Sequence, residues 1–205
     1  RQSIENAARK RPGIELILTD NKMDPEITIK NIDMFIQKEV DLVIEYQHEY
    51  NLGPLIVEKL SDAGIPIIAI DIPIPGAVYF GANNYRAGLV AGEKAVEAVR
   101  DKWDGRVDVV VTLSNTVTGP ISDNRIAGML EKVTANLSFP DDQVINVNTG
   151  NEIPVAEREF DEALDSIPPG QRILILAFND VVCIGALNAL RKRGREDDAV
   201  AVSHS

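Results

Sequence analysis

Several strongly apolar runs of the sequence end on side chains that can hydrogen-bond a small molecule. The run ILILAF at residues 173–178 stops on Asn179 and Asp180, an amide and a carboxylate side by side. Carboxylates accept hydrogen bonds from hydroxyl groups, whereas amides both donate and accept. Such groups suit an uncharged, hydroxyl-rich ligand and suit phosphate poorly, because acceptor-only groups repel oxyanions. The other runs end on Asp20, Glu45 beside Tyr46, Asp71, Ser114 with Asn115, and Asn148 with Thr149.

Motifs of catalysis, nucleotide binding and metal binding do not accompany these polar endings. The sequence has no G-x-G-x-x-G after its first predicted strand, no P-loop lysine pattern and no G-x-S-x-G elbow. His48 and His204 fit no metal-ligand spacing, and the single cysteine, Cys183, is interpreted as a small buried hydrophobic residue. We therefore expect a binding protein without catalytic residues, metal or cofactor, and keep a Rossmann-like oxidoreductase or transferase as a distant alternative.

The composition is that of a soluble globular protein that avoids nucleic acid. Of 205 residues, 44% are hydrophobic and 26% are charged, and 32 acids against 21 bases give a formal net charge of −11. A field of this sign repels phosphate backbones, so we expect no direct nucleic-acid contact by this segment. No apolar run approaches the roughly 18–20 residues that span a bilayer, and the first residues, RQSIENAARK, are no signal peptide.

Short apolar runs alternate with helical patterns along the whole chain. This alternation predicts parallel βαβ units, whose right-handed crossovers place helices on both faces of a sheet. Asp24 followed by Pro25 marks a helix start, and the small residues of the helix after Asn84 allow close approach to a sheet or another helix. Strands are predicted at 14–19, 41–46, 65–71, 107–113, 143–148, 173–178 and 199–203, and helices at 1–11, 25–36, 52–64, 84–102, 121–133, 155–167 and 180–194.

A proline-rich break separates two halves of this pattern. The stretch IPIPG at 72–76 cannot be helical, because two prolines remove backbone donors and fix φ. We place a lobe boundary near Gly81, which gives an N-terminal lobe over residues 1–81 and a C-terminal lobe over residues 82–205. The expected fold class is α/β, with two doubly wound, Rossmann-like lobes of parallel strands joined by a hinge. Ligands of open α/β sheets bind outside the carboxyl ends of the strands, so facing lobes would line one cleft with acids and amides.

Helix capping and turn formation offer alternatives to ligand binding at some of these positions. Asp180 opens a helix and is interpreted as its N-cap, and Asp20 precedes a turn whose backbone it can bond. Asp71 is followed by Ile-Pro rather than by a helix, so capping does not explain it and a ligand role is favoured. Glu45, beside Tyr46, stays open between a ligand contact and a partly exposed acid at a strand end.

Five stretches together resemble the type 1 periplasmic binding proteins, specifically the sugar-binding subset shared by ABC-transporter receptors and lactose-repressor-like regulators. The resemblance covers essentially all 205 residues. It implies two α/β lobes that close on a monosaccharide or a related small molecule. The stretches are DLVIEY (41–46), AGIPIIAID (63–71), GANNYRAGLVAGE (81–93), DNRIAGM (123–129) and AFNDVVCIGALNALRKRG (177–194).

The resemblance also implies which side chains contact the ligand. Four residues match ligand positions of the family: Glu45, Asp71, Asp123 and Asn179. At the position of Asp123 the family often has an arginine, and in this chain Arg125 lies two residues further on. Where the family often has an arginine after the Asp71 position, this chain has Ile72. Tyr46 and Asn115, at strand ends, complete the expected ligand-binding set.

A role in solute uptake follows from the same resemblance. We expect a receptor, periplasmic or extracellular, that captures a carbohydrate and delivers it to the membrane permease of an ABC transporter. The alternatives are the effector domain of a lactose-repressor-type regulator, which would be cytoplasmic, and the ligand-sensing domain of a signalling receptor. The family begins with a strand that is missing before Arg1, so the chain is expected to be truncated at both ends and to belong to a longer polypeptide.

Overall fold

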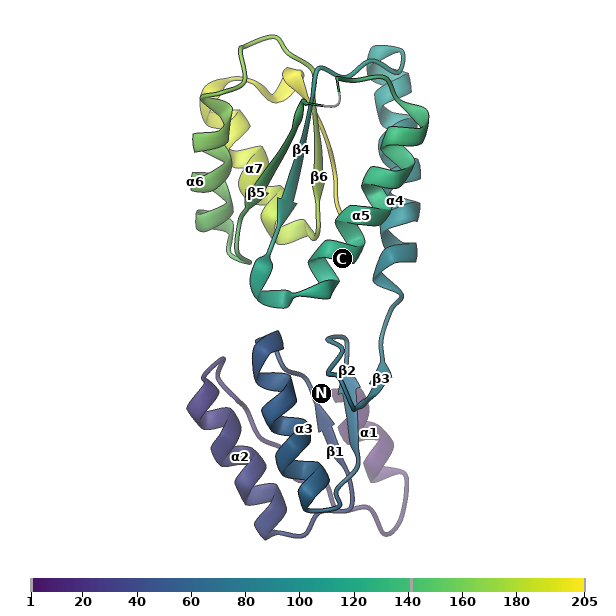
Figure 1. The fold of residues 1–205 in the computed structure, drawn as a ribbon, viewed down its shortest axis with the longest axis vertical. Coiled ribbons are helices and arrows are strands. Elements are labelled where there is room, and N and C mark those ends of the chain that lie inside the picture. The colour runs from purple at the N-terminus through teal and green to yellow at the C-terminus, as the bar shows by residue number, and fades with distance from the viewer. Residues whose placement is uncertain (1, 141, 205) are drawn as a thin grey trace. The chain divides into compact units, whose positions relative to one another are not determined.

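The computed structural model describes residues 2–140 and 142–204, and its contacts divide the chain into two units (Figure 1). The first unit comprises Arg1–Ala69 and Ile74–Val78, and the second comprises Ile70–Pro73 and Tyr79–Ser205. None of the described helices is long and apolar enough to cross a membrane.

The first unit contains three α-helices around a small sheet. Asp24 caps α2, as predicted: its carboxylate accepts hydrogen bonds from the amides of Glu26 and Ile27, at 2.8 and 3.1 Å. Residues of α2 and α3 such as Ile32 and Leu60 are buried in one core cluster with residues of β1 and β2. The strand order is β1-β2-β3, with β1 and β2 parallel. The elements are α1 (Gln2–Arg9), α2 (Pro25–Gln37), β1 (Val43–Glu45), α3 (Gly53–Asp62), β2 (Ile67–Ile70) and β3 (Val78–Phe80).

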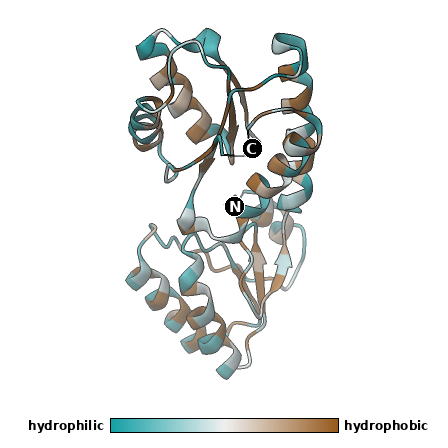
Figure 2. Cartoon of the chain, turned by 45° about the horizontal axis from the view of Figure 1, so that its top comes forward, coloured by the Kyte–Doolittle hydropathy of each residue, from teal (hydrophilic) through white to brown (hydrophobic). Residues whose placement is uncertain are grey.

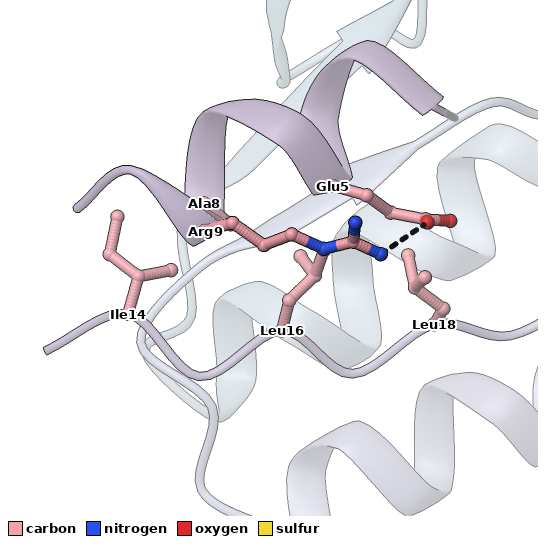
Figure 3. A pocket seen from close by; sticks show the side chains of 6 residues that line it. All are labelled: Glu5, Ala8, Arg9, Ile14, Leu16 and Leu18. Atoms are coloured by element: carbon pink, nitrogen blue, oxygen red, sulfur yellow. Dashed lines mark ion pairs between the residues drawn. The ribbon is translucent and has the colours of Figure 1, made fainter. Parts of the chain in front are cut away.

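The predicted strand at residues 14–19 is wrong. This segment has no strand hydrogen bonds, and its alternate side chains Ile14, Leu16 and Leu18 are 52%, 37% and 42% exposed. An apolar run becomes a buried strand only when a neighbouring strand pairs with its backbone, and no strand that the structure describes does so. Instead, as Figure 3 shows, the segment and α1 line a shallow pocket formed by Glu5, Ala8, Arg9, Ile14, Leu16 and Leu18.

The second unit is a four-stranded parallel sheet covered on both faces. The strand order is β5-β4-β6-β7, and all three neighbouring pairs are parallel. Helices α4 and α5 pack together on one face, and α6 and α7 pack together on the other (Figure 1). This arrangement confirms the predicted doubly wound α/β class. The elements are α4 (Asn84–Trp103), β4 (Val109–Ser114), α5 (Pro120–Asn136), β5 (Val144–Asn148), α6 (Ile153–Leu164), β6 (Ile173–Ala177), α7 (Asp180–Arg193) and β7 (Ala199–Val202).

The central strands of this unit are apolar throughout because helices cover both of their faces. Every residue of β6 is buried, and so is every residue of β4 except Ser114. Figure 2 shows these strands in the hydrophobic colour, whereas the loops around them are largely hydrophilic. Continuous apolar runs of this kind are typical of parallel sheets, in contrast to the alternating pattern of a sheet with one wet face.

Glycines let α4 and α5 approach each other closely. A methyl group added at Gly88 would collide with the backbone carbonyl of Arg125, and one added at Gly128 would collide with the carbonyl of Tyr85. At Gly92 the added carbon would lie 2.8 Å from the carbonyl oxygen of Met129. The predicted close approach of the small-residue face of α4 is therefore confirmed, and its partner is another helix.

We expect Gly128→Ala to lower the free energy of unfolding by about 1–3 kcal/mol, because the new methyl group separates α5 from α4. Helix propensity alone would change stability in the opposite direction, by about 1 kcal/mol, which makes a net loss diagnostic. Urea denaturation measures the effect. Asn124→Ala, at an exposed position of the same helix, is the matched control and should change stability by no more than about 0.5 kcal/mol. A Gly128→Ala protein as stable as the wild type would contradict the assigned packing.

Candidate functional site

Arg125 connects the ends of two strands of the second unit to the start of α4. Its Nε donates a hydrogen bond to Oδ1 of Asn84 at 2.9 Å. Its Nη1 donates to the backbone carbonyls of Phe178 and His204, at 2.9 and 3.1 Å. Phe178 directly follows β6 and His204 lies just beyond β7. The guanidinium group is thus held at the carboxyl edge of the sheet.

This edge contains the topological switch point of the sheet. From β4 the chain passes through α5 to β5 on one side, and β6 lies on the other side of β4. The helices that follow β4 and β6, α5 and α7, cover opposite faces, so the chain leaves the two strands in opposite directions. Ligands of open α/β sheets bind in the crevice that such divergence opens. Asn115 follows β4 and Asn179 lies just after β6, so both predicted residues flank this point.

Asp71 has a backbone conformation that calls for an explanation. Its φ is +60°, in the left-handed region that residues with a side chain adopt at a cost of about 1–3 kcal/mol. The Asp71 amide donates to the carbonyl of Phe80 at 3.1 Å, and the Tyr79 hydroxyl lies 3.2 Å from the Asp71 carbonyl oxygen. These contacts hold the turn, while the carboxylate is exposed. Strained residues of this kind cluster at functional sites.

The charges of Asp71 and Arg125 interact. Burial lowers the pKa of Arg125, and the neighbouring Tyr79, Asp71 and Asp180 act in the opposite direction by favouring the charged guanidinium. Two of the predicted ligand residues therefore interact electrostatically, one a cation rich in donors and the other an acceptor. An uncharged polyol can bridge such a pair, since each of its hydroxyl groups donates and accepts.

The capping residue of α7 differs from the prediction. Asn179, and not Asp180, is the N-cap: its backbone is extended and its Oδ1 accepts a hydrogen bond from the Val182 amide at 3.1 Å. The Asn179 Nδ2 donates to Oδ1 of Asn151 at 2.7 Å. Asp180 is the first helical residue and accepts a hydrogen bond from the Ser203 hydroxyl. The ligand contact of Asn179 stays a prediction.

Two further predicted residues lie on the connection from β4 to α5. Asn115 is buried, and its Oδ1 accepts a hydrogen bond from the Val117 amide at 3.0 Å. Its backbone amide donates to the Ser122 hydroxyl at 2.9 Å, so the residue stabilises the turn. Asp123 is exposed in the first turn of α5, where a carboxylate interacts favourably with the helix dipole. Ligand roles for Asn115 and Asp123 stay predictions.

The polar residues at the end of β5 connect that strand to β4. The Thr149 hydroxyl donates to the Ser114 carbonyl at 3.0 Å, and the Asn148 side chain hydrogen-bonds Thr116. These hydrogen bonds account for the polar side chains at the end of β5 without a ligand.

In the first unit, Glu45 is a buried acid at the end of β1. It is only 5% exposed, so its interpretation as a partly exposed strand-end acid is wrong, whereas the adjacent Tyr46 is 57% exposed. Burial raises the pKa of Glu45 from 4.5 to about 7, against the smaller opposing effect of a hydrogen bond from Asn21. That bond runs from Asn21 Nδ2 to Glu45 Oε1 at 3.0 Å, and Asn21 in turn accepts from Asn31 at 2.9 Å. Acids buried in this way cluster at functional sites.

Several of these residues were not predicted from the sequence. Asn21 follows Asp20 at the end of the same apolar run, so the signal that drew attention to Asp20 could have found it. Asp20 itself accepts a hydrogen bond from the Lys22 amide at 2.8 Å, which confirms its predicted contact with the loop backbone. Asn31 and Tyr79 carried no signal, because neither stands at a strand end or in a motif. Among the described residues, no group of three or more His, Cys, Asp and Glu is placed to hold a metal ion.

We expect the stability gap between Glu45→Gln and the wild type to depend on pH. The folded state holds the Glu45 proton up to about pH 7 whereas the unfolded state releases it near 4.5, so folding binds protons in this window and wild-type stability falls as pH rises. The variant cannot ionise, and its amide oxygen can still accept from Asn21. The stability of Glu45→Gln relative to the wild type should rise by about 3 kcal/mol between pH 4.5 and 8. This is the free energy that corresponds to a rise in the pKa of Glu45 from 4.5 to about 7.

Urea denaturation at a series of pH values measures this gap. Glu58→Gln, at an exposed position of α3, is the matched control, and its stability should follow that of the wild type at every pH. A gap for Glu45→Gln that does not change with pH would show that Glu45 ionises normally in the folded protein.

Comparison with known proteins places this fold in a family. Residues 1–204 match the family described as periplasmic binding protein domain. The chain is 27% identical over 188 residues to the xylitol-binding protein of Mycolicibacterium smegmatis; this covers 91% of the chain and 52% of the relative, so the chain spans about half of that protein's length.

Solved structures share the same fold. The fructose-binding periplasmic domain of a hybrid two-component system superposes with a TM-score of 0.82 and 24% identity, over 98% of this chain and 65% of that one. An ABC transporter solute-binding protein from Bacillus halodurans, with bound myo-inositol, superposes with a TM-score of 0.81 and 20% identity, over 98% and 68%. The matched residues and the doubly wound sheet agree with the resemblance that the sequence carries, and the chain therefore belongs to the periplasmic binding protein family.

Proposed function

We propose that the protein containing this chain is a solute-binding receptor that captures an uncharged sugar or polyol for an ABC transporter. The observation that carries the proposal is the position of Arg125, which is held at the carboxyl ends of β6 and β7 and interacts electrostatically with the exposed carboxylate of Asp71. Membership of a binding-protein family supports capture of a ligand rather than its conversion.

The side chains at the strand ends favour a neutral, hydroxyl-rich ligand. In the second unit Arg125 is a donor and Asp71 is an acceptor, and a hydrogen bond to a charged group contributes about 1.5–3 kcal/mol. Three or four such bonds, after the cost of ordering, correspond to micromolar affinity at about −8 kcal/mol. The relatives support this class, because one is named a xylitol-binding protein and others were solved with myo-inositol and D-allose.

We infer further that the receptor works outside the cytoplasm and delivers its ligand to a membrane permease. This inference is supported by the family's description and by similar structures described as ABC transporter solute-binding proteins. Binding shifts the protein between its open and closed populations and requires no chemical step. The effector domain of a regulator stays an alternative without a specific observation in its favour.

The ligand-sensing domain of a signalling receptor is the second candidate. It is favoured by one similar structure, the periplasmic domain of a hybrid two-component system. The gene itself distinguishes the two candidates: a transmembrane helix and a kinase encoded after residue 205 would identify the sensor, and a separate permease gene alongside would identify the receptor.

We expect calorimetric titration of the full protein to detect one or more neutral polyols with a dissociation constant on the order of 1 μM. The panel is xylitol, myo-inositol, D-allose and fructose. Phosphorylated forms of the bound compound should bind at least about tenfold more weakly, because the Asp71 carboxylate repels an oxyanion. Absence of binding by the whole panel at millimolar concentration, or preference for the phosphorylated form, would contradict the proposed ligand class.

We expect Asp71→Asn to weaken binding of that polyol at least about tenfold, because the amide lacks the charge that strengthens hydrogen bonds from hydroxyl groups. Asparagine tolerates the left-handed backbone, so the melting temperature of the free protein should stay within a few degrees. Calorimetry and thermal unfolding measure the two effects. Asp101→Asn, at an exposed position of α4, is the control that should change neither. Unchanged affinity for Asp71→Asn would make Asp71 a structural residue.

A further inference from the structure

Buried side-chain nitrogens without a hydrogen-bond partner are few among the described residues. They are Nε2 of Gln47, Nε2 of His48 and Nδ1 of His204. Two of the three directly follow the end of β1, in the first unit, two and three residues beyond the buried acid Glu45. A buried donor left without a partner costs free energy, so its position calls for a partner that the described residues do not supply.

The orientation of the Gln47 amide is set by its oxygen. Gln47 is 5% exposed, and its Oε1 accepts a hydrogen bond from the Glu49 backbone amide at 2.8 Å. Exchanging the amide oxygen and nitrogen would place a donor against a donor, so the Nε2 amino group must point away from Glu49. The amino group is therefore held in one direction, as a donor with nothing to donate to.

Gln47 continues the buried side of β1. Val43, Glu45 and Gln47 are buried, while the intervening Ile44 and Tyr46 are exposed. Alternation of this kind is typical of an extended chain whose successive side chains point to opposite sides. Gln47 therefore follows on the same side as Glu45.

Glu45 offers the complementary function. Asn21 donates to its Oε1, and no group among the described residues donates to its Oε2. One side of the chain after β1 thus presents an available carboxyl oxygen and, two residues later, an amino group with a free proton. When one hydroxyl group of a ligand donates a hydrogen bond to the Glu45 oxygen, the adjacent hydroxyl group of the same ligand can accept one from the Gln47 amino group.

We propose that Gln47 is a specificity-determining ligand contact, and that Glu45 and Gln47 together bind two adjacent hydroxyl groups of the polyol. The inference rests on the proposed function and extends it, because it names the feature of the ligand that the first unit recognises: a vicinal diol. A site whose buried donor needs a hydroxyl oxygen discriminates strongly against an analogue that lacks it.

The test uses Gln47→Met, which keeps the length of the side chain and removes both the amino group and the oxygen that accepts from the Glu49 amide. Affinity for the best-bound polyol of the panel should fall at least about tenfold by calorimetry. The melting temperature of the free protein reflects two opposing effects, the loss of an unsatisfied donor and the loss of the acceptor for the Glu49 amide, and thermal unfolding measures their balance. Gln37→Met, at an exposed position of α2, is the matched control and should change neither quantity.

Single-hydroxyl deletions in the ligand separate a direct contact from a structural effect. The test compares the affinities of wild type and Gln47→Met for a series of monodeoxy analogues. The two proteins should bind the analogue that lacks the hydroxyl contacted by Gln47 with equal affinity. For every other analogue, their affinities should differ at least about tenfold. Unchanged affinity for the parent polyol, or an equal loss of affinity for every analogue, would overturn the assignment. A wild-type protein that binds no member of the panel would instead overturn the proposed function itself.

Discussion

The close contact between α4 and α5 is the constraint on which the candidate site of the second unit depends. Gly88 lies against the backbone carbonyl of Arg125, so α4 packs on the very turn of α5 that carries the guanidinium group. From there Arg125 reaches Asn84 at the start of α4 and the carbonyl groups beyond β6 and β7. The packing of α4 on α5 and the topology of the sheet therefore fix the position of the Arg125 charge. A wider separation of the helices would move the cation away from the strand ends.

The two units present different chemistry. In the second unit a cation held at the carboxyl ends of β6 and β7 interacts electrostatically with a strained, exposed carboxylate. In the first, burial raises the pKa of Glu45, the last residue of β1, to about 7, and the buried amide of Gln47 lacks a complete set of partners among the described residues. Neither set contains a metal cluster among the described residues, and both offer donors and acceptors to uncharged hydroxyl groups. This common preference supports capture of a sugar or polyol.

Much of the architecture could be predicted because local and global preferences agree. The continuous apolar runs of β4 and β6 specify strands covered on both faces, and Asp24 with Pro25 specifies a helix start. The prediction failed where the outcome depends on a neighbour. Residues 14–19 have the composition of a strand, but no described strand pairs with them. At the start of α7, two adjacent capping residues were available, and the extended backbone of Asn179 decided between them.

The sequence by itself determined the class of the fold and the polar character of the strand ends, because both follow from the order of residues along the chain. It could not determine which of those ends have partners. Asn115 and Asn148 use their side chains to stabilise the sheet edge, whereas Gln47, which carried no signal, retains an unpaired donor. Only the tertiary structure decided this, because a hydrogen bond depends on which groups the packing of distant segments brings within about 3 Å of each other.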